Sequence, residues 1–351
     1  MSLSKIARPP RPSATHHEVD RPSEDYSATP GGTRLAASAV TELVSDTIQQ
    51  AMASRMMHLA LALAFLGLLA CLSIGVEGPR QLLIDGEIEL LDAQNRPIEA
   101  PGASLGRMTI GFGLASVGNF RDAESQVRFL QAILARWAAG VAGTLILLAS
   151  TAGFLPDFLR PGVSTVLLTK PVPRWALLAG KSIGVLSFVA GLAGLFVLGT
   201  WLALGVRTGV WASGYLLAWP LLVTQFAGLY AASVVAATCT RNTAASLFAA
   251  LACWMICLGV NGARETLLVP DGSPATSSIA MSAVEAAYWI LPKPVDFSKA
   301  LDRAVSASDH FSGSDGPPIG TFALAASVGT SLAFAVVMLG IGARQLETTD
   351  Y

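Results

Sequence analysis

The chain has 351 residues, of which 52% are hydrophobic and only 13% are charged, against a usual charged share of about a quarter. The apolar residues come in long blocks, which excludes a soluble globular domain of this length. The formal net charge of −1 gives no general basic field that would point to nucleic acid. Among the four cysteines, Cys253 and Cys257 share one helix face and are interpreted as small buried thiols rather than a metal or redox pair.

Residues 1–34 are rich in Pro, Ser, Arg and His and predict a disordered cytoplasmic tail, whereas 35–351 predict a transmembrane domain. Apolar residues recur at helical spacing just before the first apolar block. This pattern predicts an amphipathic helix in the inner membrane interface, and the alternative is a helix packed on a soluble partner. Its apolar positions are Val40, Leu43, Val44, Ile48 and Ala51.

Six blocks are long enough to span a membrane, which requires about 20 predominantly apolar residues each. Charge is nearly absent within them, and Gln225 is the one strongly polar group expected at mid-helix. Arg136 and Lys181 lie near span ends, where their side chains are expected to reach the interface. The predicted spans are 56–76, 133–154, 176–204, 213–237, 243–261 and 321–342.

Basic residues near the span ends predict the orientation. The segment 155–181 carries four basic residues against Asp157, and Arg55, Arg241 and Arg344 fall on the same side if the spans alternate. We therefore expect a multi-pass protein of the plasma (inner) membrane with both termini in the cytoplasm.

Two long loops, 77–132 and 262–320, fall on the outer side. In the first, the stretch LLIDGEIEL alternates apolar and acidic residues, a period typical of a strand. The predicted fold class is therefore an all-α polytopic membrane protein with six transmembrane helices and a small extracytoplasmic subdomain that contains a β-hairpin.

A polar segment rich in proline separates the second and third spans. Pro161 suits the first position of a short helix, and Pro171 and Pro173 end it. This pattern predicts a short cytoplasmic helix with an apolar ridge and basic ends. The alternative is an ordinary basic loop. The residues on the common face are Val163, Val166, Leu167 and Lys170.

The stretch LRPGVSTVLLTKPVPRWALLAGKSIG resembles the segment that follows the second span in permeases of the ABC-2 type. The layout of residues 38–346 is also similar to that family, with an amphipathic helix, six spans, a large first extracytoplasmic loop and a re-entrant loop before the last span. The matching residues are Gly162, Leu167, Leu168, Lys170, Pro171, Val172, Arg174, Gly180 and Lys181.

This resemblance implies the permease subunit of an ABC transporter, an exporter of an unidentified substrate. A separate ATPase subunit would bind ATP and Mg²⁺, so this chain would hold no cofactor and would not be an enzyme. The short cytoplasmic helix would be the coupling helix that docks on that ATPase, and Asp157 would replace an upstream glutamate of the family at a different spacing. The implied docking residues are Asp157, Arg160, Gly162, Val163, Val166, Leu167, Leu168, Lys170, Pro171 and Arg174.

Further implied partners are membrane lipid and a second permease chain, either another copy or a paralogue. The loop before the last span contains AAYWILPKPVDF, an apolar and aromatic stretch broken by two prolines, which predicts a re-entrant or interfacial hairpin. We expect this hairpin to act as an outer gate, and the alternative is a surface helix that anchors the loop. The expected gate residues are Tyr288, Trp289, Pro292 and Pro294.

Other function classes fit less well. AGKS at 179–182 lacks the earlier glycine of a phosphate-binding loop, because Trp175 occupies that position. Ion-coupled transport usually needs ionisable residues within the spans, and these are scarce. A non-transporting membrane scaffold or envelope-complex subunit remains the alternative, since it would require only the docking helix and the outer loops.

Overall fold

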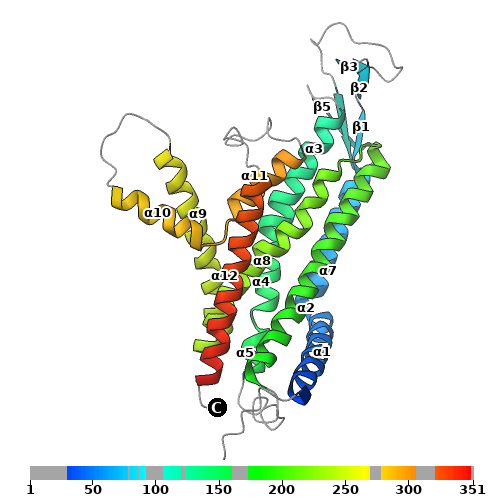
Figure 1. Ribbon diagram of the computed structural model, residues 1–351. Coiled ribbons are helices and arrows are strands. Elements are labelled where there is room, and N and C mark those ends of the chain that lie inside the picture. Colours follow the sequence, from blue (N-terminus) through cyan, green and yellow to red (C-terminus); the bar gives the residue numbers. More distant parts are fainter. Residues whose placement is uncertain are drawn as a thin grey trace, which may run out of the picture.

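The computed structural model describes residues 30–77, 80–84, 87–91, 106–119, 123–159, 173–268, 278–305 and 321–348. Within this part of the chain, six helical segments are long and apolar enough to cross a membrane, the make-up of a multi-pass membrane protein. The segments form an elongated bundle, with α1 (Pro30–Ala53) at one end and the strands at the other (Figure 1).

The second span is a succession of four helical pieces, and the fourth span begins with one turn of 3₁₀ helix. The spans are α2 (Arg55–Ser73); α3 (Ala123–Ile133), the π-helix η2 (Leu134–Gly143), α4 (Thr144–Thr151) and α5 (Phe154–Phe158); α7 (Arg174–Thr208); η3 (Ser213–Leu217) and α8 (Ala218–Thr240); α9 (Thr243–Leu268); and α12 (Thr321–Thr348).

Each predicted span overlaps one of these segments, but most boundaries differ from the prediction. The second span begins at Ala123 rather than at residue 133, and spans three to six all continue past their predicted ends. The first span ends at Ser73 rather than at residue 76, because Gly75–Glu77 pair as a strand. The helix α1 already begins at Pro30, within the predicted tail. Proline suits a first helical position, but the two glycines that follow it are weak helix formers and hide this start in the sequence.

The helix α8 forms the centre of the bundle. Of its most apolar stretch 72% is buried, against 17–33% for the other five spans. Its Phe226, Leu229, Tyr230 and Val234 belong to the main hydrophobic core, to which α7 and α9 also contribute. The outer spans turn their remaining apolar side chains outward, as expected where lipid replaces water.

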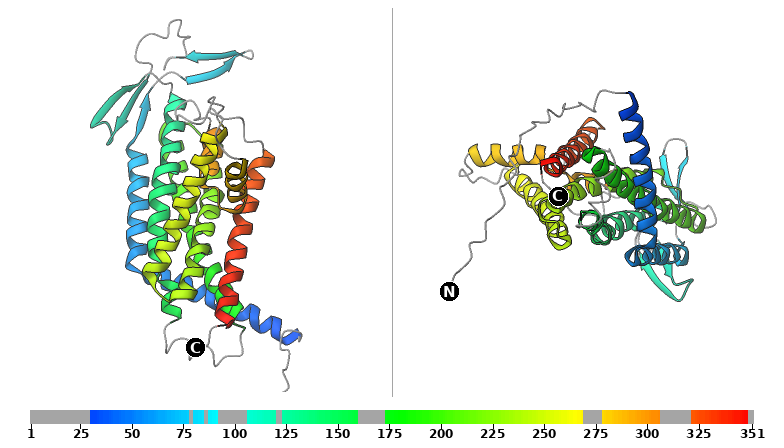
Figure 2. Two further views of the ribbon diagram at one scale, coloured as in Figure 1. Left: turned by 90° about the vertical axis from the view of Figure 1, so that its left-hand side faces the viewer. Right: turned by 90° about the horizontal axis from the view of Figure 1, so that it is seen from below.

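Within the described ranges, five short strands lie at the end of the bundle opposite α1 (Figure 2, left). The predicted hairpin is confirmed as β2 (Arg80–Ile84) paired antiparallel with β3 (Glu87–Leu91). A second sheet of order β1-β4-β5 joins β1 (Gly75–Glu77) to β4 (Gly106–Ile110) and β5 (Ala115–Asn119). This second sheet was not predicted from the sequence.

The helix α1 lies across the lower end of α7 (Figure 2, right). Close approach depends on Gly180 and Gly184, because a Cβ atom at Gly180 would lie 3.0 Å from Cβ of Leu43 and one at Gly184 would lie 2.7 Å from Cβ of Thr47. Thr47 is fully buried. The apolar face predicted for this helix therefore packs on the third span of its own chain, an arrangement that neither sequence alternative included.

The Lys181 side chain is buried under α1 with 2% of its surface exposed. Its Nζ donates a hydrogen bond to Oε1 of Gln50 at 2.6 Å and lies 4.0 Å from Oδ2 of Asp46. The rings of Phe154 and Phe158 on α5 lie 6.0 and 5.7 Å from the same atom. The expectation that Lys181 extends to the interface is therefore wrong, because the ammonium finds its polar partners on α1.

Replacing Gly184 with valine tests the contact between α1 and α7. The branched side chain would overlap Thr47, and overpacking of this kind costs about 1–3 kcal/mol. We expect a lower midpoint of thermal unfolding for the detergent-solubilised protein. Gly191→Val is the matched control, since no atom lies within 4 Å of a Cβ atom built at that position of the same helix. Equal midpoints for the two variants would contradict the contact.

Candidate functional site: the α10–α11 hairpin

Two helices, α10 (Ser278–Ile290) and α11 (Pro294–Ala304), form a hairpin between α9 and α12. Pro292 and Pro294 bring about the break, since neither can donate a backbone hydrogen bond, and Pro294 starts α11 at a position that tolerates proline. Pro292 packs on Gly228, where a Cβ atom would lie only 2.9 Å from Cγ of the proline. Gly228 is near the middle of the fourth span, so the hairpin tip reaches the middle of the bundle.

Hydroxyl groups of α12 accept the hydrogen bonds that Lys293, at the break, cannot make within a helix. Its backbone N donates to Oγ of Ser331 at 3.3 Å, and its Nζ donates to Oγ1 of Thr330 at 2.9 Å, both on α12. The same ammonium lies 4.5 Å from the ring centre of Tyr288 and 4.2 Å from that of Trp289. Only 1% of Lys293 is exposed, so these contacts replace water around its charge.

Asp296 supplies a buried negative charge one turn further along. Its Oδ2 accepts hydrogen bonds from the hydroxyl groups of Tyr288, at 2.5 Å, and Ser327, at 3.1 Å. The tyrosine thus contacts the lysine with its ring and the aspartate with its hydroxyl group. This arrangement locks the end of α10 to the start of α11 and to α12.

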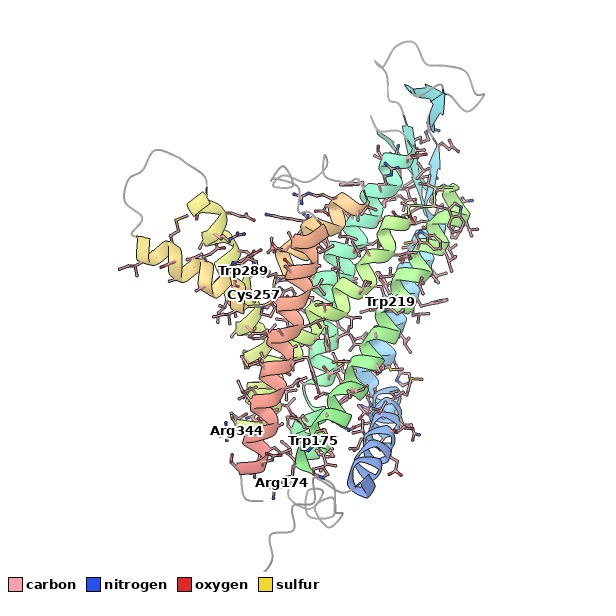
Figure 3. The ribbon with its side chains drawn as sticks, in the orientation of Figure 1. Arg174, Trp175, Trp219, Cys257, Trp289 and Arg344 are labelled. Atoms are coloured by element: carbon pink, nitrogen blue, oxygen red, sulfur yellow. The ribbon has the colours of Figure 1, made fainter. Side chains whose placement is uncertain are left out.

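A third set of contacts joins the hairpin to the end of α9. Nε of Arg264 donates to Oε2 of Glu285 at 3.0 Å, and the guanidinium group stacks 3.9 Å from the centre of the Tyr288 ring. Nε1 of Trp289 donates to the other carboxylate oxygen of Glu285, also at 3.0 Å. Figure 3 places Trp289 at the level of Cys257, well within α9.

The far end of α11 is anchored to the second span by an ion pair. Arg136, in the π-helix η2, donates to the carboxylate of Asp302, which is 1% exposed. Burial raises the pKa of Asp302, whereas the Arg136 guanidinium lowers it. The expectation that Arg136 extends to the interface is therefore wrong, because a buried carboxylate holds its guanidinium group.

The π-helix also explains the polar residue predicted at mid-span. A π-helix pairs each carbonyl group with the N–H five residues on, so the change to the i→i+4 pattern of α4 leaves one carbonyl group without a backbone donor. Nε2 of Gln225 on α8 donates to the carbonyl oxygen of Gly140 at 3.2 Å, and the bond is buried. Gln225 therefore satisfies the backbone of the neighbouring span.

A groove of about 590 Å³ runs beside the hairpin. Its walls come from η2, α8, α9 and α11, and they are mostly apolar. The polar contributions come from Arg136, Gln225 and Ser298, whereas Trp137, Trp254 and Met255 are among the apolar ones. The shape and lining suit an apolar or amphipathic molecule rather than an ion.

The four predicted gate residues, Tyr288, Trp289, Pro292 and Pro294, all lie at or beside the hairpin break. Of the ten predicted docking residues, only Asp157 and Arg174 lie within the described residues. Arg174 donates to the carbonyl oxygens of Leu346 and Glu347 at 3.0 and 3.4 Å, and so caps the C-terminal end of α12. Outside the described residues lie Arg160, Gly162, Val163, Val166, Leu167, Leu168, Lys170 and Pro171.

Sequence reasoning missed the charged residues of the hairpin. Lys293, Asp296 and Asp302 were not among the site residues predicted from the sequence. One signal was available, namely that KPVDF places a lysine and an aspartate on either side of a proline within an apolar, aromatic stretch. Among the described residues, no group of three or more His, Cys, Asp or Glu side chains lies close enough together to hold a metal ion.

Comparisons of this chain with protein-family models, with curated proteins and with solved structures find no match. The site must therefore be interpreted from its own geometry. Its charged groups are engaged with one another, with hydroxyl groups and with aromatic rings, an arrangement that holds a broken helix in place.

Replacing Asp302 with asparagine tests the anchor of α11. Breaking a buried ion pair by removing one partner costs about 3 kcal/mol or more, so we expect the free energy of unfolding to fall by that amount. Unfolding in mixed micelles with increasing SDS measures it.

The matched control is Glu265→Gln, which removes a carboxylate from the ion pair with Lys299 at the other side of the hairpin. The side chain of Glu265 is 55% exposed, and exposed pairs contribute at most about 1 kcal/mol. A loss in the Asp302 variant no larger than in this control would show that the anchor does not stabilise the fold.

Proposed function

We propose that this chain is the permease subunit of an ABC-2-type exporter, driven by ATP that a separate ATPase subunit hydrolyses. The six membrane-spanning helices and the motif between spans two and three support this assignment. The protein would lie in the plasma (inner) membrane with both termini in the cytoplasm and α1 in the inner interface. Two permease chains would enclose the transport path.

The observation that carries the proposal concerns the residues that flank the docking segment. The helix α5 ends at Phe158 and α7 begins at Arg174, so they flank the stretch 160–172, and both helix ends lie at the end of the bundle where α1 and the end of α12 lie (Figure 1). Lys181 ties α1, α5 and α7 together at this end, and Arg174 ties α7 to α12. A force applied between α5 and α7 would therefore move spans two, three and six together with α1. A docking site for an ATPase requires this kind of connection.

The hairpin would serve as the outer gate of the path. Its two helices are held by polar contacts to α9, α12 and the second span, so a shift of any of these would move the break. The groove beside it, with apolar walls and a few polar groups, would admit an amphipathic substrate. Charge-poor spans disfavour the passage of naked ions.

Replacing both Leu167 and Leu168 with aspartate tests the docking element. The two charges would have to lose water in an apolar groove of the ATPase, at a cost of several kcal/mol. We expect the ATPase to fail to co-purify from the native membrane while the permease still inserts. Gln49→Asp adds a charge to an exposed position of α1 at the same end and should leave co-purification unchanged. Normal co-purification and export by the double variant would refute the docking role.

Replacing Trp289 with alanine tests the gate. The variant loses the ring beneath the Lys293 ammonium and the hydrogen bond to Glu285, so the hairpin should be held less firmly against α9 and α12. We expect altered export at unchanged ATPase binding, and a crosslinker at residue 289 should reach a second permease chain. Ile290→Ala removes a more exposed neighbour without such contacts and is the control. If Trp289 crosslinks only to lipid and its alanine variant exports normally, the hairpin is a surface anchor.

A further inference from the structure

The turn between β4 and β5 points back toward the bundle, as the strand register requires. β1 follows α2 directly, and its pairing with β4 is antiparallel, with Gly75 opposite Thr109 and Glu77 opposite Arg107. The strand β4 therefore runs toward the end of α2 as the chain passes from Arg107 to Thr109. The turn that follows, residues 111–114, must lie at the level where the first span ends.

Two hydrogen bonds fix this level. The backbone N of Phe112 donates to the carbonyl oxygen of Ser73 at 3.0 Å, and the backbone N of Gly111 donates to Oγ of Ser73 at 3.4 Å. Ser73 is the last residue of α2. The strands around this turn lie beside the upper end of α2 (Figure 2, left).

The turn exposes large apolar side chains. Phe112 is 71% exposed and Leu114 is 93% exposed, and Ile110 and Val117 on the flanking strands are also exposed. A hairpin turn that faces water normally carries polar residues, whereas exposed apolar side chains of this size indicate contact with another surface.

The backbone of the turn holds these side chains outward under strain. Three successive residues have positive φ angles, namely Gly111 at 66°, Phe112 at 57° and Gly113 at 97°. Glycine adopts this region freely, but an aromatic residue there is an outlier that must be held in place by its surroundings. The bonds to Ser73 provide that hold.

We propose that the β4–β5 turn is a membrane anchor, with Phe112 and Leu114 inserted in the outer leaflet of the same lipid bilayer that surrounds the spans. The turn continues an apolar surface of the first span, whose Leu66 and Leu69 are exposed one to two helical turns below Ser73. Above it, Glu77 and Arg107 form the next exposed pair on the water side. This order from apolar to charged follows the polarity profile of a membrane interface.

The anchor determines how the small extracytoplasmic sheet sits. Because β1, β4 and β5 form one sheet, insertion of the turn would hold the whole sheet against the membrane surface beside α2. The partner is thus the lipid surface and no soluble protein.

Fluorescence quenching in liposomes tests the anchor on the full chain. Cys239 is exposed and is first changed to serine, whereas Cys71, Cys253 and Cys257 are buried. A polarity-sensitive dye is then attached at Leu114→Cys or, as the matched control, at Glu77→Cys. We expect nitroxide-bearing lipids to quench the dye at position 114 several-fold more than at 77, and aqueous iodide to quench it several-fold less.

Two outcomes would overturn the proposal. If iodide quenches the dye at position 114 as strongly as at 77, the turn faces water. If neither quencher reaches position 114, a protein surface such as a second copy of this chain covers the turn. Because neither outcome involves ATP or an ATPase, the test is independent of the proposed transport function.

Discussion

The structure depends on one constraint, which is that the break between α10 and α11 lies against the middle of the central helix. Polar backbone groups at such a depth are tolerated only where protein or enclosed water satisfies them. Here the hydroxyl group of Ser331 accepts a hydrogen bond from the backbone N of Lys293, and Gly228, which has no side chain, leaves room for Pro292. The position of the hairpin break therefore depends on Gly228 of α8 and Ser331 of α12 as well as on the residues of the hairpin.

Once a lysine is buried at this break, the surrounding charges follow from electrostatics. An isolated ammonium group away from water is costly, so aromatic rings and a nearby carboxylate must replace its hydration. Lys293 and Arg264 are balanced by Asp296 and Glu285, which makes the four-residue group neutral. Such a group gives the hairpin a defined position rather than a large net stability, because the desolvation penalty cancels much of the attraction.

The sequence predicts what local patterns determine. The lengths of the apolar blocks predict the six spans, and the alternation of apolar and acidic residues predicts the hairpin of β2 and β3. Two prolines predict the break between α10 and α11. Contacts between distant residues could not be predicted this way. Arg136 meets a carboxylate 166 residues away, and Lys181 meets Gln50 131 residues away. Nothing near either basic residue indicates that its charge is buried, so an extended side chain at the interface was the natural local interpretation.

The helix α12 links the two ends of the molecule. Near its N-terminal end it carries the hydroxyl groups that hold the hairpin, with Ser327 bonded to Asp296 and Thr330 to Lys293. At its C-terminal end its last carbonyl groups accept from Arg174, the residue that opens the third span after the proposed docking segment. A helix of 28 residues packed along α8 transmits displacement as a stiff rod. Under the proposed function, movement of the docking segment would therefore reach the outer gate through the contacts of α12 with Arg174 at one end and with the hairpin at the other.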